Sequence, residues 1–443
     1  MAGLKEKFQS KLGPMRERVT KLVKEKGDVV IDDVTISQVI GGMRDIRSMW
    51  WVISDLDPQE GIRFRGETIP DLQAKLPKAP GGSEPMPEGI FYFLLTGELP
   101  TYEDCAAITE EWRRRGALPG HLLTTMEAIP TDTHPMTQFA MAILALQRDS
   151  KFTHKYRAGM PKGDYWDPMY EDVMDLLAKL PEIAARIYRR SYKGGHYIAP
   201  DPKLDWAANQ AHMLGIDKPE FYDLMRLYLV IHSDHEGGNV SAHTCHLVGS
   251  ALSDAFYSMS AAMDGLAGPL HGLANQEVLR WIMDVMKELG GVPTKEQLHK
   301  YLWDTLKSGK VIPGYGHAVL RKTDPRYIAQ REFALKHLPN YDMFRVVSDI
   351  YEVAPKILIE QGKAKNPWPN VDAHSGVLLF YYGLTEYDFY TVLFGVSRAM
   401  GILAQLIWSR AMGLAIERPK SVLVEWLEEQ AAKAPAKGPA PAK

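Results

Sequence analysis

The chain has 443 residues, of which 45% are hydrophobic and 24% are charged, and its net charge is −3. This is the composition of a soluble globular protein long enough to bury a core without disulfide or metal support, and the charge argues against a general nucleic-acid binder. Two cysteines, Cys105 and Cys245, exclude a disulfide scaffold and favour a reducing compartment.

Helical periodicity dominates the chain from its first residues. Residues 1–26 predict a charged amphipathic helix in which Leu4, Phe8 and Leu12 share one face, and this segment lacks the apolar core of a signal peptide. Residues 29–34 and 62–66 alternate as short strands and predict a small N-terminal hairpin. Further helices are predicted over residues 102–115, 136–146, 170–190, 221–231, 242–263, 275–289, 295–308, 325–337, 342–361 and 388–412. The predicted fold is therefore mainly α.

Four stretches of the C-terminal half refine this prediction. Residues 241–270 are rich in Gly, Ala and Ser, which suits either a tight helix–helix contact, within or between subunits, or an ordinary buried helix. Arg398 and Arg410 interrupt the apolar stretch 389–416, so we expect a buried helix and no membrane span. Residues 385–388 resemble a capping box that opens this helix. The tail, 431–443, contains only Ala, Lys, Pro and Gly and is predicted to be disordered.

Several familiar kinds of site are missing from the sequence or only weakly indicated. The pairs His232/His235 and His243/His246 have a spacing that can place two zinc ligands on one helix face. Histidines on helix faces more often pack or form hydrogen bonds, so we predict no metal site. The sequence contains no nucleophile elbow, no phosphate-binding loop with Gly-Lys-Ser/Thr and no Gly-x-Gly-x-x-Gly motif.

Three loops rich in glycine and proline present titratable side chains. They contain His271 in Gly-Pro-Leu-His-Gly, His317 in Pro-Gly-Tyr-Gly-His, and Asp372 in Pro-Asn-Val-Asp-Ala-His. Glycine permits close approaches, and proline fixes the chain where a side chain must be aimed. One carboxylate and two imidazoles suit the movement of protons between carbon and oxygen. An apolar pocket would make Asp372 more basic, and His271, just ahead of a helix, would stay neutral and donate a hydrogen bond.

Three arginines indicate a class of ligand. Arg326 follows Asp-Pro, Arg398 lies in the most apolar helix, and Arg418 precedes a proline just beyond that helix. A buried guanidinium needs an anionic partner, which is either an internal Asp or Glu or the carboxylate of a ligand.

Basic residues also flank two of the loops. Arg321-Lys322 follows the His317 loop, and Lys363-Ala-Lys365 precedes the Asp372 loop. They could hold the phosphates of a large cofactor, or they could be solvated surface charges.

As an ordered set, these motifs resemble the citrate synthase family. The resemblance is carried by residues 263–272, 311–317, 321–326 and 362–376, by His235-Glu-Gly-Gly-Asn239 and by Gly395-Val-Ser-Arg398. It extends from Gly41-Gly-Met-Arg44 to Glu417-Arg-Pro-Lys420, which is nearly the whole chain. It is greatest to the dimeric type typified by mitochondrial enzymes.

The resemblance implies a two-domain, almost entirely helical fold. Residues 1–271 would form the first part of a large domain, residues 272–381 a smaller mobile domain, and residues 382–430 the C-terminal helices of the large domain, followed by the tail 431–443. The small domain would close over oxaloacetate, complete the acetyl-CoA site and exclude water. The family is dimeric, so a homodimer is expected.

It also implies catalytic roles. In this family acetyl-CoA condenses with oxaloacetate, and citryl-CoA is hydrolysed to citrate and CoA. Asp372 would remove the methyl proton, His271 would donate to the thioester oxygen, and His317 would polarise the oxaloacetate carbonyl and protonate the alkoxide.

The remaining implied roles are in binding. Oxaloacetate would contact His235, Arg326 and Arg398, together with Arg418 of the neighbouring subunit. The adenine of CoA would lie on the loop of Val311, Pro313, Gly314, Tyr315 and Gly316, and the CoA phosphates would contact Arg44, Arg321, Lys363 and Lys365. CoA would act as a co-substrate, with no tightly bound cofactor and no membrane or nucleic-acid partner.

Alternatives remain open at this stage. A 2-methylcitrate synthase that uses propionyl-CoA is the nearest, because one methylene changes binding by only ~1–3 kcal/mol. The same residues would also serve citrate cleavage, and an inactive helical scaffold or CoA-binding module would share the fold. The sequence shows no extra N-terminal β-rich domain of the hexameric, NADH-inhibited relatives, which favours a simple dimer. We expect a bacterial cytoplasmic enzyme, with a processed mitochondrial matrix form as the alternative.

Overall fold

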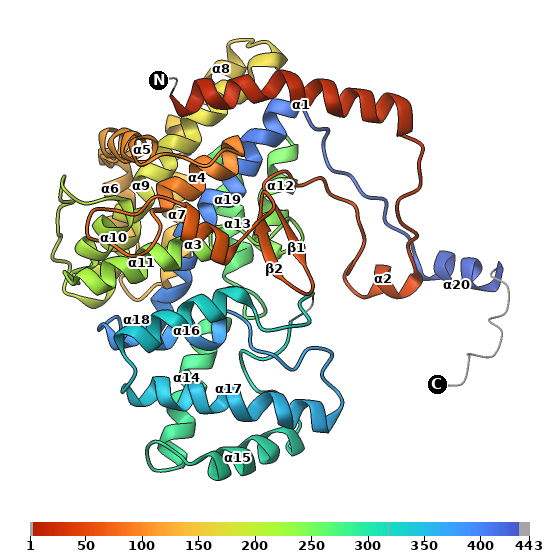
Figure 1. Ribbon diagram of the computed structural model, residues 1–443. Helices are drawn as coiled ribbons and strands as arrows, with labels where there is room; N and C mark the ends of the chain where they lie inside the picture. Colours follow the sequence, from red (N-terminus) through yellow and green to blue (C-terminus); the bar gives the residue numbers. More distant parts are fainter. Residues whose placement is uncertain (1–2, 318, 434–443) are drawn as a thin grey trace.

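The computed structural model describes residues 3–317 and 319–433, most of which are helical (Figure 1). The first half contains α1 (Leu4–Lys26), α2 (Ile36–Ile40), α3 (Ile69–Lys75), α4 (Pro87–Thr96), α5 (Tyr102–Arg115), α6 (Gly120–Ala128), α7 (Pro135–Ala145), α8 (Lys151–Arg157), α9 (Trp166–Tyr192), α10 (Trp206–Leu214) and α11 (Pro219–Ile231). The second half contains α12 (Val240–Ser250), α13 (Ala255–Leu266), α14 (Ala274–Glu288), α15 (Lys295–Lys307), α16 (Pro325–His337), α17 (Asp342–Gln361), α18 (Asp372–Tyr381), α19 (Tyr390–Met412) and α20 (Val424–Lys433). Short 3-10 helices lie at Leu146–Asp149, Lys162–Asp164 and Tyr387–Phe389.

Helix α19 is the central core helix, as the sequence predicts. Residues 389–408 are all buried, and the helix packs against α4, α9 and α12. By length and composition, the segment Tyr387–Met412 is the one helix among the described residues that could cross a membrane, yet its apolar window lies wholly inside the protein. Its hydrophobicity is therefore explained by the core.

The prediction of one long helix over 242–263 is wrong. The chain turns between α12 and α13 because Leu252 adopts a left-handed φ of 65° and Asp254 caps α13, accepting hydrogen bonds from the backbone of Phe256 and Tyr257. The small residues of this stretch serve close contacts within the chain. A side chain at Gly265 would lie 3.0 Å from Val240, and one at Gly249 would collide with Leu406 of α19.

The N-terminal sheet differs from the predicted hairpin. Strands β1 (Ser54–Asp57), β2 (Gly61–Phe64) and β3 (Glu67–Thr68) form a three-stranded antiparallel sheet, with Ser54 opposite Phe64 and Arg63 opposite Thr68. The predicted strand 62–66 overlaps β2, but 29–34 is not a strand and is largely exposed.

Two predictions near the C-terminus also need correction. Residues 385–388 form no capping box, because α19 starts at Tyr390 and Glu386 instead accepts hydrogen bonds from Tyr188 and Lys193. Residues 431–433 of the predicted disordered tail are the last residues of α20, and residues 434–443 lie outside the described part of the chain.

The arrangement of the helices separates two groups. Helices α14–α18 lie together at the bottom of Figure 1, below the larger group around α19. Within this smaller group, α14 packs on α18 and α15 packs on α17. The loops that lead into and out of α14–α18 carry most of the predicted site residues.

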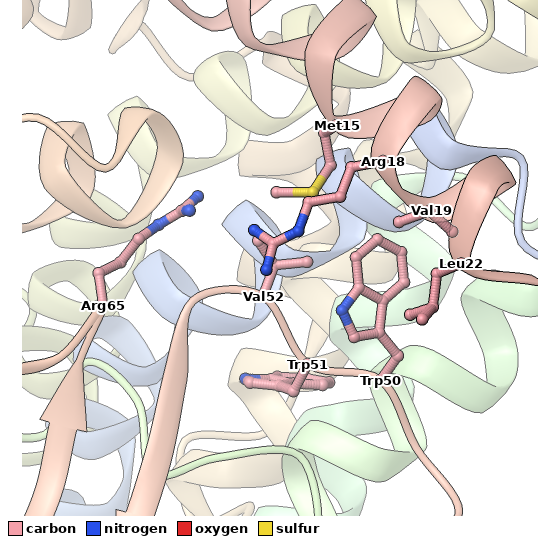
Figure 2. A pocket seen from close by; sticks show the side chains of 8 residues that line it. All are labelled: Met15, Arg18, Val19, Leu22, Trp50, Trp51, Val52 and Arg65. Carbon is pink, nitrogen blue, oxygen red and sulfur yellow. The ribbon is translucent and has the colours of Figure 1, made fainter. Parts of the chain in front are cut away.

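Two segments extend away from the larger group on the same side, namely residues 27–50 with α2 and residues 413–433 with α20 (Figure 1). Both expose large apolar side chains, such as Val30, Ile31, Ile40 and Leu423 at 70–78% exposure. Beneath the end of α1 lies an open cavity of about 400 Å³, lined by Leu22, Trp50, Trp51, Arg18 and Arg65 (Figure 2).

Candidate active site

The candidate site forms where the two groups of helices meet. The larger group contributes His235, which follows α11, and Arg398 in α19. His271 lies between α13 and α14, where the chain passes to the smaller group. His317 precedes α16, Arg326 lies in its first turn and Asp372 begins α18. Burial lowers the pKa of His235 well below its usual value, and the neighbouring Arg326, His317, Arg398 and His271 lower it further, so these side chains lie near His235.

Arg398 is fully buried and has only neutral hydrogen-bond acceptors. Its Nε donates to the carbonyl of His232 at 3.1 Å, and its Nη1 donates to Asn239 Oδ1 at 3.0 Å and to Ser241 Oγ at 3.4 Å. Burial lowers the pKa of Arg398 to about 10, so it stays cationic at neutral pH. Arg398 therefore has no ion pair at hydrogen-bond distance among the described residues, although the charges of Asp234, Asp372 and Glu236 act on it from further away.

His271 is held in one neutral tautomer. The backbone N–H of Ser241, which can only donate, points to His271 Nε2 at 3.3 Å, so the ring proton lies on Nδ1. The Ser241 hydroxyl is also 2.9 Å from Nε2. Burial, followed by the charge of Arg398, lowers the pKa of His271 to about 3. The imidazole is thus neutral and carries its proton on Nδ1.

His317 has the opposite tautomer. Its Nδ1 accepts hydrogen bonds from the backbone N–H groups of Val319 and Leu320, both at 3.0 Å, which leaves the proton on Nε2. Burial and the nearby Arg326 lower the pKa of His317 to about 4. Its ring meets that of His235 edge to face, with 5.4 Å between centroids. His235 Nε2 is buried and has no hydrogen-bond partner among the described residues.

Arg326 differs from Arg398 because a carboxylate balances it. Asp324 caps α16 and accepts two hydrogen bonds from Arg326 Nε, at 3.0 and 3.2 Å, and one from Nη2 at 2.6 Å. Both side chains are buried. Asp324 thereby fixes the plane of the guanidinium.

Asp372 is the carboxylate of the site. Its backbone N–H is held by Asn370 Oδ1 at 3.0 Å at the start of α18. Burial raises the pKa of Asp372 to about 6, although Arg326 and Arg398 lower it in part. A carboxylate with a raised pKa can accept a proton from a weak acid near neutral pH.

The two loops that carry His317 and Asp372 are joined to each other. Gly316 N donates to the Trp368 carbonyl at 3.0 Å, Asn370 N donates to the Gly314 carbonyl at 2.9 Å, and Tyr315 pairs with Pro369. Gly314 has a φ of 78°, and a side chain there would lie 2.9 Å from the backbone of Ala373, so only glycine fits. Pro313 is half-buried, whereas Val311 is 75% exposed at the edge of this loop pair.

The predicted phosphate-binding residues are not all brought together. Lys363 and Lys365 are exposed just before the Asp372 loop. Arg321 donates to the carbonyls of Val319 and Leu320, and its backbone N–H donates to Pro58 in the β1–β2 turn. Arg44 follows α2, which lies away from α14–α18 in Figure 1.

Arg418 does not reach the site of its own chain. It is exposed beyond α19 and forms no hydrogen bond or ion pair within residues 3–317 and 319–433. The preceding residue, Glu417, contacts His243 at 2.7 Å and lies 3.8 Å from His246. In the described part of the chain, no group of three or more His, Cys, Asp or Glu side chains is arranged to hold a metal ion.

Sequence reasoning assigned no role to three residues that shape the site. Asn239 caps α12 and accepts from Arg398, Ser241 fixes His271, and Asp324 fixes Arg326. Asn239 lies inside a motif used for the resemblance, and the Asp-Pro-Arg sequence at 324–326 is a helix-start signal. These signals indicated local structure but not the contacts with distant residues.

Comparison with known proteins shows to which family the sequence is similar. A family model described as "Citrate synthase, C-terminal domain" matches residues 42–420. Citrate synthase, mitochondrial, of Xiphias gladius is 58% identical over 425 residues, covering 96% of this chain and 91% of that protein. A 2-methylcitrate synthase, mitochondrial, of Yarrowia lipolytica is 59% identical over 425 residues, with the same coverage of 96% and 91%.

The fold has solved counterparts as well. The Thermoplasma acidophilum citrate synthase, in a ternary complex with carboxymethyl coenzyme A and oxaloacetate, matches with a TM-score of 0.73 at 22% identity. The match covers 93% of this chain and 98% of that chain. With the family model spanning most of the sequence and relatives of this similarity, the chain belongs to the citrate synthase family, whose members are transferases.

Proposed function

We propose that this protein condenses acetyl-CoA with oxaloacetate and hydrolyses the resulting citryl-CoA to citrate and CoA, the first step of the tricarboxylic acid cycle. The observation that carries the proposal is the combination of Asp372, whose pKa is raised to about 6, with two neutral imidazoles and two buried arginines. Such a set can take a proton from carbon while cationic groups hold a dicarboxylate.

Oxaloacetate would bind against Arg398, Arg326 and His235. Among the described residues, the hydrogen-bond acceptors of Arg398 are neutral, which supports a direct pairing with a substrate carboxylate. His235 Nε2 is a buried atom that needs a partner, and an oxygen of the substrate would supply it.

Enolisation would follow at the acetyl group. Asp372 removes a methyl proton from acetyl-CoA, and the Nδ1–H of His271 donates to the thioester oxygen as negative charge develops there. Because the pKa of His271 is lowered to about 3, the ring donates this hydrogen bond as a neutral imidazole at neutral pH.

Carbon–carbon bond formation would use His317. The nucleophilic carbon attacks the oxaloacetate carbonyl carbon, and the Nε2–H of His317 polarises the carbonyl oxygen and protonates the alkoxide. Water then cleaves the thioester of citryl-CoA, releasing citrate and the thiol of CoA. The hydrogen bonds from Val319 and Leu320 support this role because they keep the proton on Nε2.

CoA would act as a co-substrate rather than as a tightly bound cofactor. Its adenine would lie on the loop of residues 311–316 and its phosphates against Arg321, Lys363 and Lys365. Residues 272–381 would form a small domain that closes onto a large domain of residues 1–271 and 382–430. The separate packing of α14–α18 in Figure 1 supports this division.

The active form would be a homodimer in which Arg418 enters the partner's site. Two observations support it. Arg418 is exposed and forms no hydrogen bond or ion pair within residues 3–317 and 319–433, and the extended segments around α2 and α20 expose large apolar side chains. Arg44 on the first of these segments would also reach CoA only through this assembly.

The cellular location follows from similarity alone. The Xiphias gladius and Yarrowia lipolytica enzymes are both named as mitochondrial proteins, which favours the mitochondrial matrix over the bacterial cytoplasm. The cytoplasmic assignment stays a prediction.

A second candidate is 2-methylcitrate synthesis from propionyl-CoA and oxaloacetate, favoured by the 59% identity to the Yarrowia lipolytica enzyme. Measuring CoA release with acetyl-CoA and with propionyl-CoA, each with oxaloacetate, separates the two. We expect the larger kcat/KM with acetyl-CoA. A larger value with propionyl-CoA would select the second candidate, and no release from folded protein with either would overturn both.

A further inference from the structure

The segment that carries Arg418 has one side-chain anchor close to this arginine. After α19, residues 414–423 have no regular secondary structure, and Arg418, Pro419 and Lys420 are exposed. Glu417 is half-buried, and its backbone N–H donates to Ser250 Oγ at 3.0 Å. Its carboxylate turns inward to α12.

Two histidines of α12 receive this carboxylate. His243 Nε2 lies 2.7 Å from Glu417 Oε1, and His246 Nε2 lies 3.8 Å from Oε2. The three side chains are 12–29% exposed, so the cluster is shielded but not sealed from solvent. Trp51 packs edge to face on His246, and its Nε1 donates to Asp234 at 3.0 Å, next to His235.

The same helix also shapes the site of its own chain. Asn239 and Ser241, at the start of α12, contact Arg398 and His271, and His243 follows half a turn later. One rigid element therefore positions site residues at its first turn and holds the segment that bears Arg418 immediately afterwards.

We propose that the His243–Glu417 hydrogen bond positions Arg418 for the partner's oxaloacetate site, with His246 as a supporting contact. This rests on the proposed entry of Arg418 into that site. Glu417 and His243 are positioning residues, because they act through Arg418 and touch no substrate. Arg418 precedes Pro419, and the residue before a proline is restricted in conformation. Fixing the neighbouring Glu417 therefore limits the directions in which the Arg418 side chain can leave the surface.

The test measures KM for oxaloacetate and kcat in the full-length enzyme. R418A should raise KM for oxaloacetate strongly, and the other variants are compared with it. E417A and H243A should each raise KM about tenfold, the loss expected for a charge-assisted hydrogen bond, with a smaller change in kcat. E417Q keeps an acceptor and H243Q keeps a donor, so both should recover most of the affinity. The double variant E417A/H243A should be no worse than either single variant.

A matched control lies elsewhere on the surface. His212 Nδ1 contacts Asp217 at 2.7 Å, the same chemistry remote from the site, and D217A should leave KM unchanged. The proposal is overturned if E417A keeps the wild-type KM, if the E417A and H243A effects add, or if R418A has no effect on KM. Failure of the proposed function is distinguishable, because it would appear as absent CoA release in the wild-type enzyme.

Discussion

Two buried arginines enter the candidate site from different parts of the fold, and their surroundings differ. Arg398, in the core helix α19, donates to a carbonyl, an amide and a hydroxyl, whereas Arg326, in α16, is paired with the carboxylate of Asp324. The guanidinium on the α19 side therefore has no ion pair at hydrogen-bond distance among the described residues, and carboxylates such as Asp234 act on it only from further away, while the guanidinium on the α16 side is paired directly with Asp324. In the proposed function, Arg398 of α19 would supply attraction for the dicarboxylate and Arg326 of α16 would supply its orientation.

Substitution of Asp372, the proposed base at the start of α18, has the largest expected effect. D372N should lower kcat by roughly 10³–10⁴-fold, the upper range for an acid–base residue, because the amide cannot accept the methyl proton. Oxaloacetate affinity, measured by calorimetry, should stay within a few-fold of wild type. A loss of affinity as large as the loss of turnover would make Asp372 a binding residue instead.

Substitution of His271, the proposed hydrogen-bond donor, should have the second largest effect. H271A should lower kcat at least about a hundredfold, because it removes a preorganised donor aimed at developing charge. S241A serves as the comparison, because it keeps the backbone N–H that fixes the tautomer and should cost far less activity. Near-normal turnover in H271A would remove this histidine from the mechanism.

Substitutions of Arg326 and Arg398 should separate an effect on stability from an effect on substrate binding. R326Q leaves Asp324 buried and unpaired, so the free energy of unfolding should fall by about 3–5 kcal/mol, whereas R398Q should raise KM for oxaloacetate with a smaller loss of stability. Denaturant unfolding and steady-state kinetics measure both quantities. The control D324N/R326Q should recover stability but not KM. Equal losses of stability in R326Q and R398Q would contradict the comparison.

The smallest effect is the pH dependence. Because burial raises the pKa of Asp372 to about 6, the ionised base is present above this pH and is lost as the pH falls through it. We expect kcat to be half-maximal near pH 6 and to approach a tenfold fall for each further pH unit. His271 and His317, with pKa values lowered to about 3 and 4, should add no second step between pH 5 and 8. A half-maximal pH below 4.5 would contradict this assignment.

Helices with strong local signals could be predicted from the sequence. Residues 102–115, 325–337 and 342–361 match α5, α16 and α17, and α5 and α16 start at capping side chains of Thr101 and Asp324. The alternating pattern of residues 29–34 predicts a strand, but in the described part of the chain no strand pairs with them. The break between α12 and α13 was missed because the Asp254 cap lies within an otherwise continuous helical pattern.

The features of the candidate site also divide into those that local sequence signals mark and those that depend on tertiary contacts. His271, His317 and Asp372 could be singled out because glycine and proline mark their loops locally. The tautomers of His271 and His317 could not be predicted from the sequence, because they are set by backbone N–H groups whose positions depend on tertiary structure. Likewise, the contrast between Arg398 and Arg326 depends on which acceptors surround each guanidinium.

The pairing of residues 314–316 with 368–370 has a consequence for anyone who wishes to redesign the enzyme. Because Tyr315 pairs with Pro369 and Gly314 lies against Ala373, a change of length or bulk in one loop displaces the other. A library that varies the two loops independently would consist mostly of mismatched pairs. Grafting both loops together, as one cassette from a single donor enzyme, is the exchange that the hydrogen-bond pattern allows.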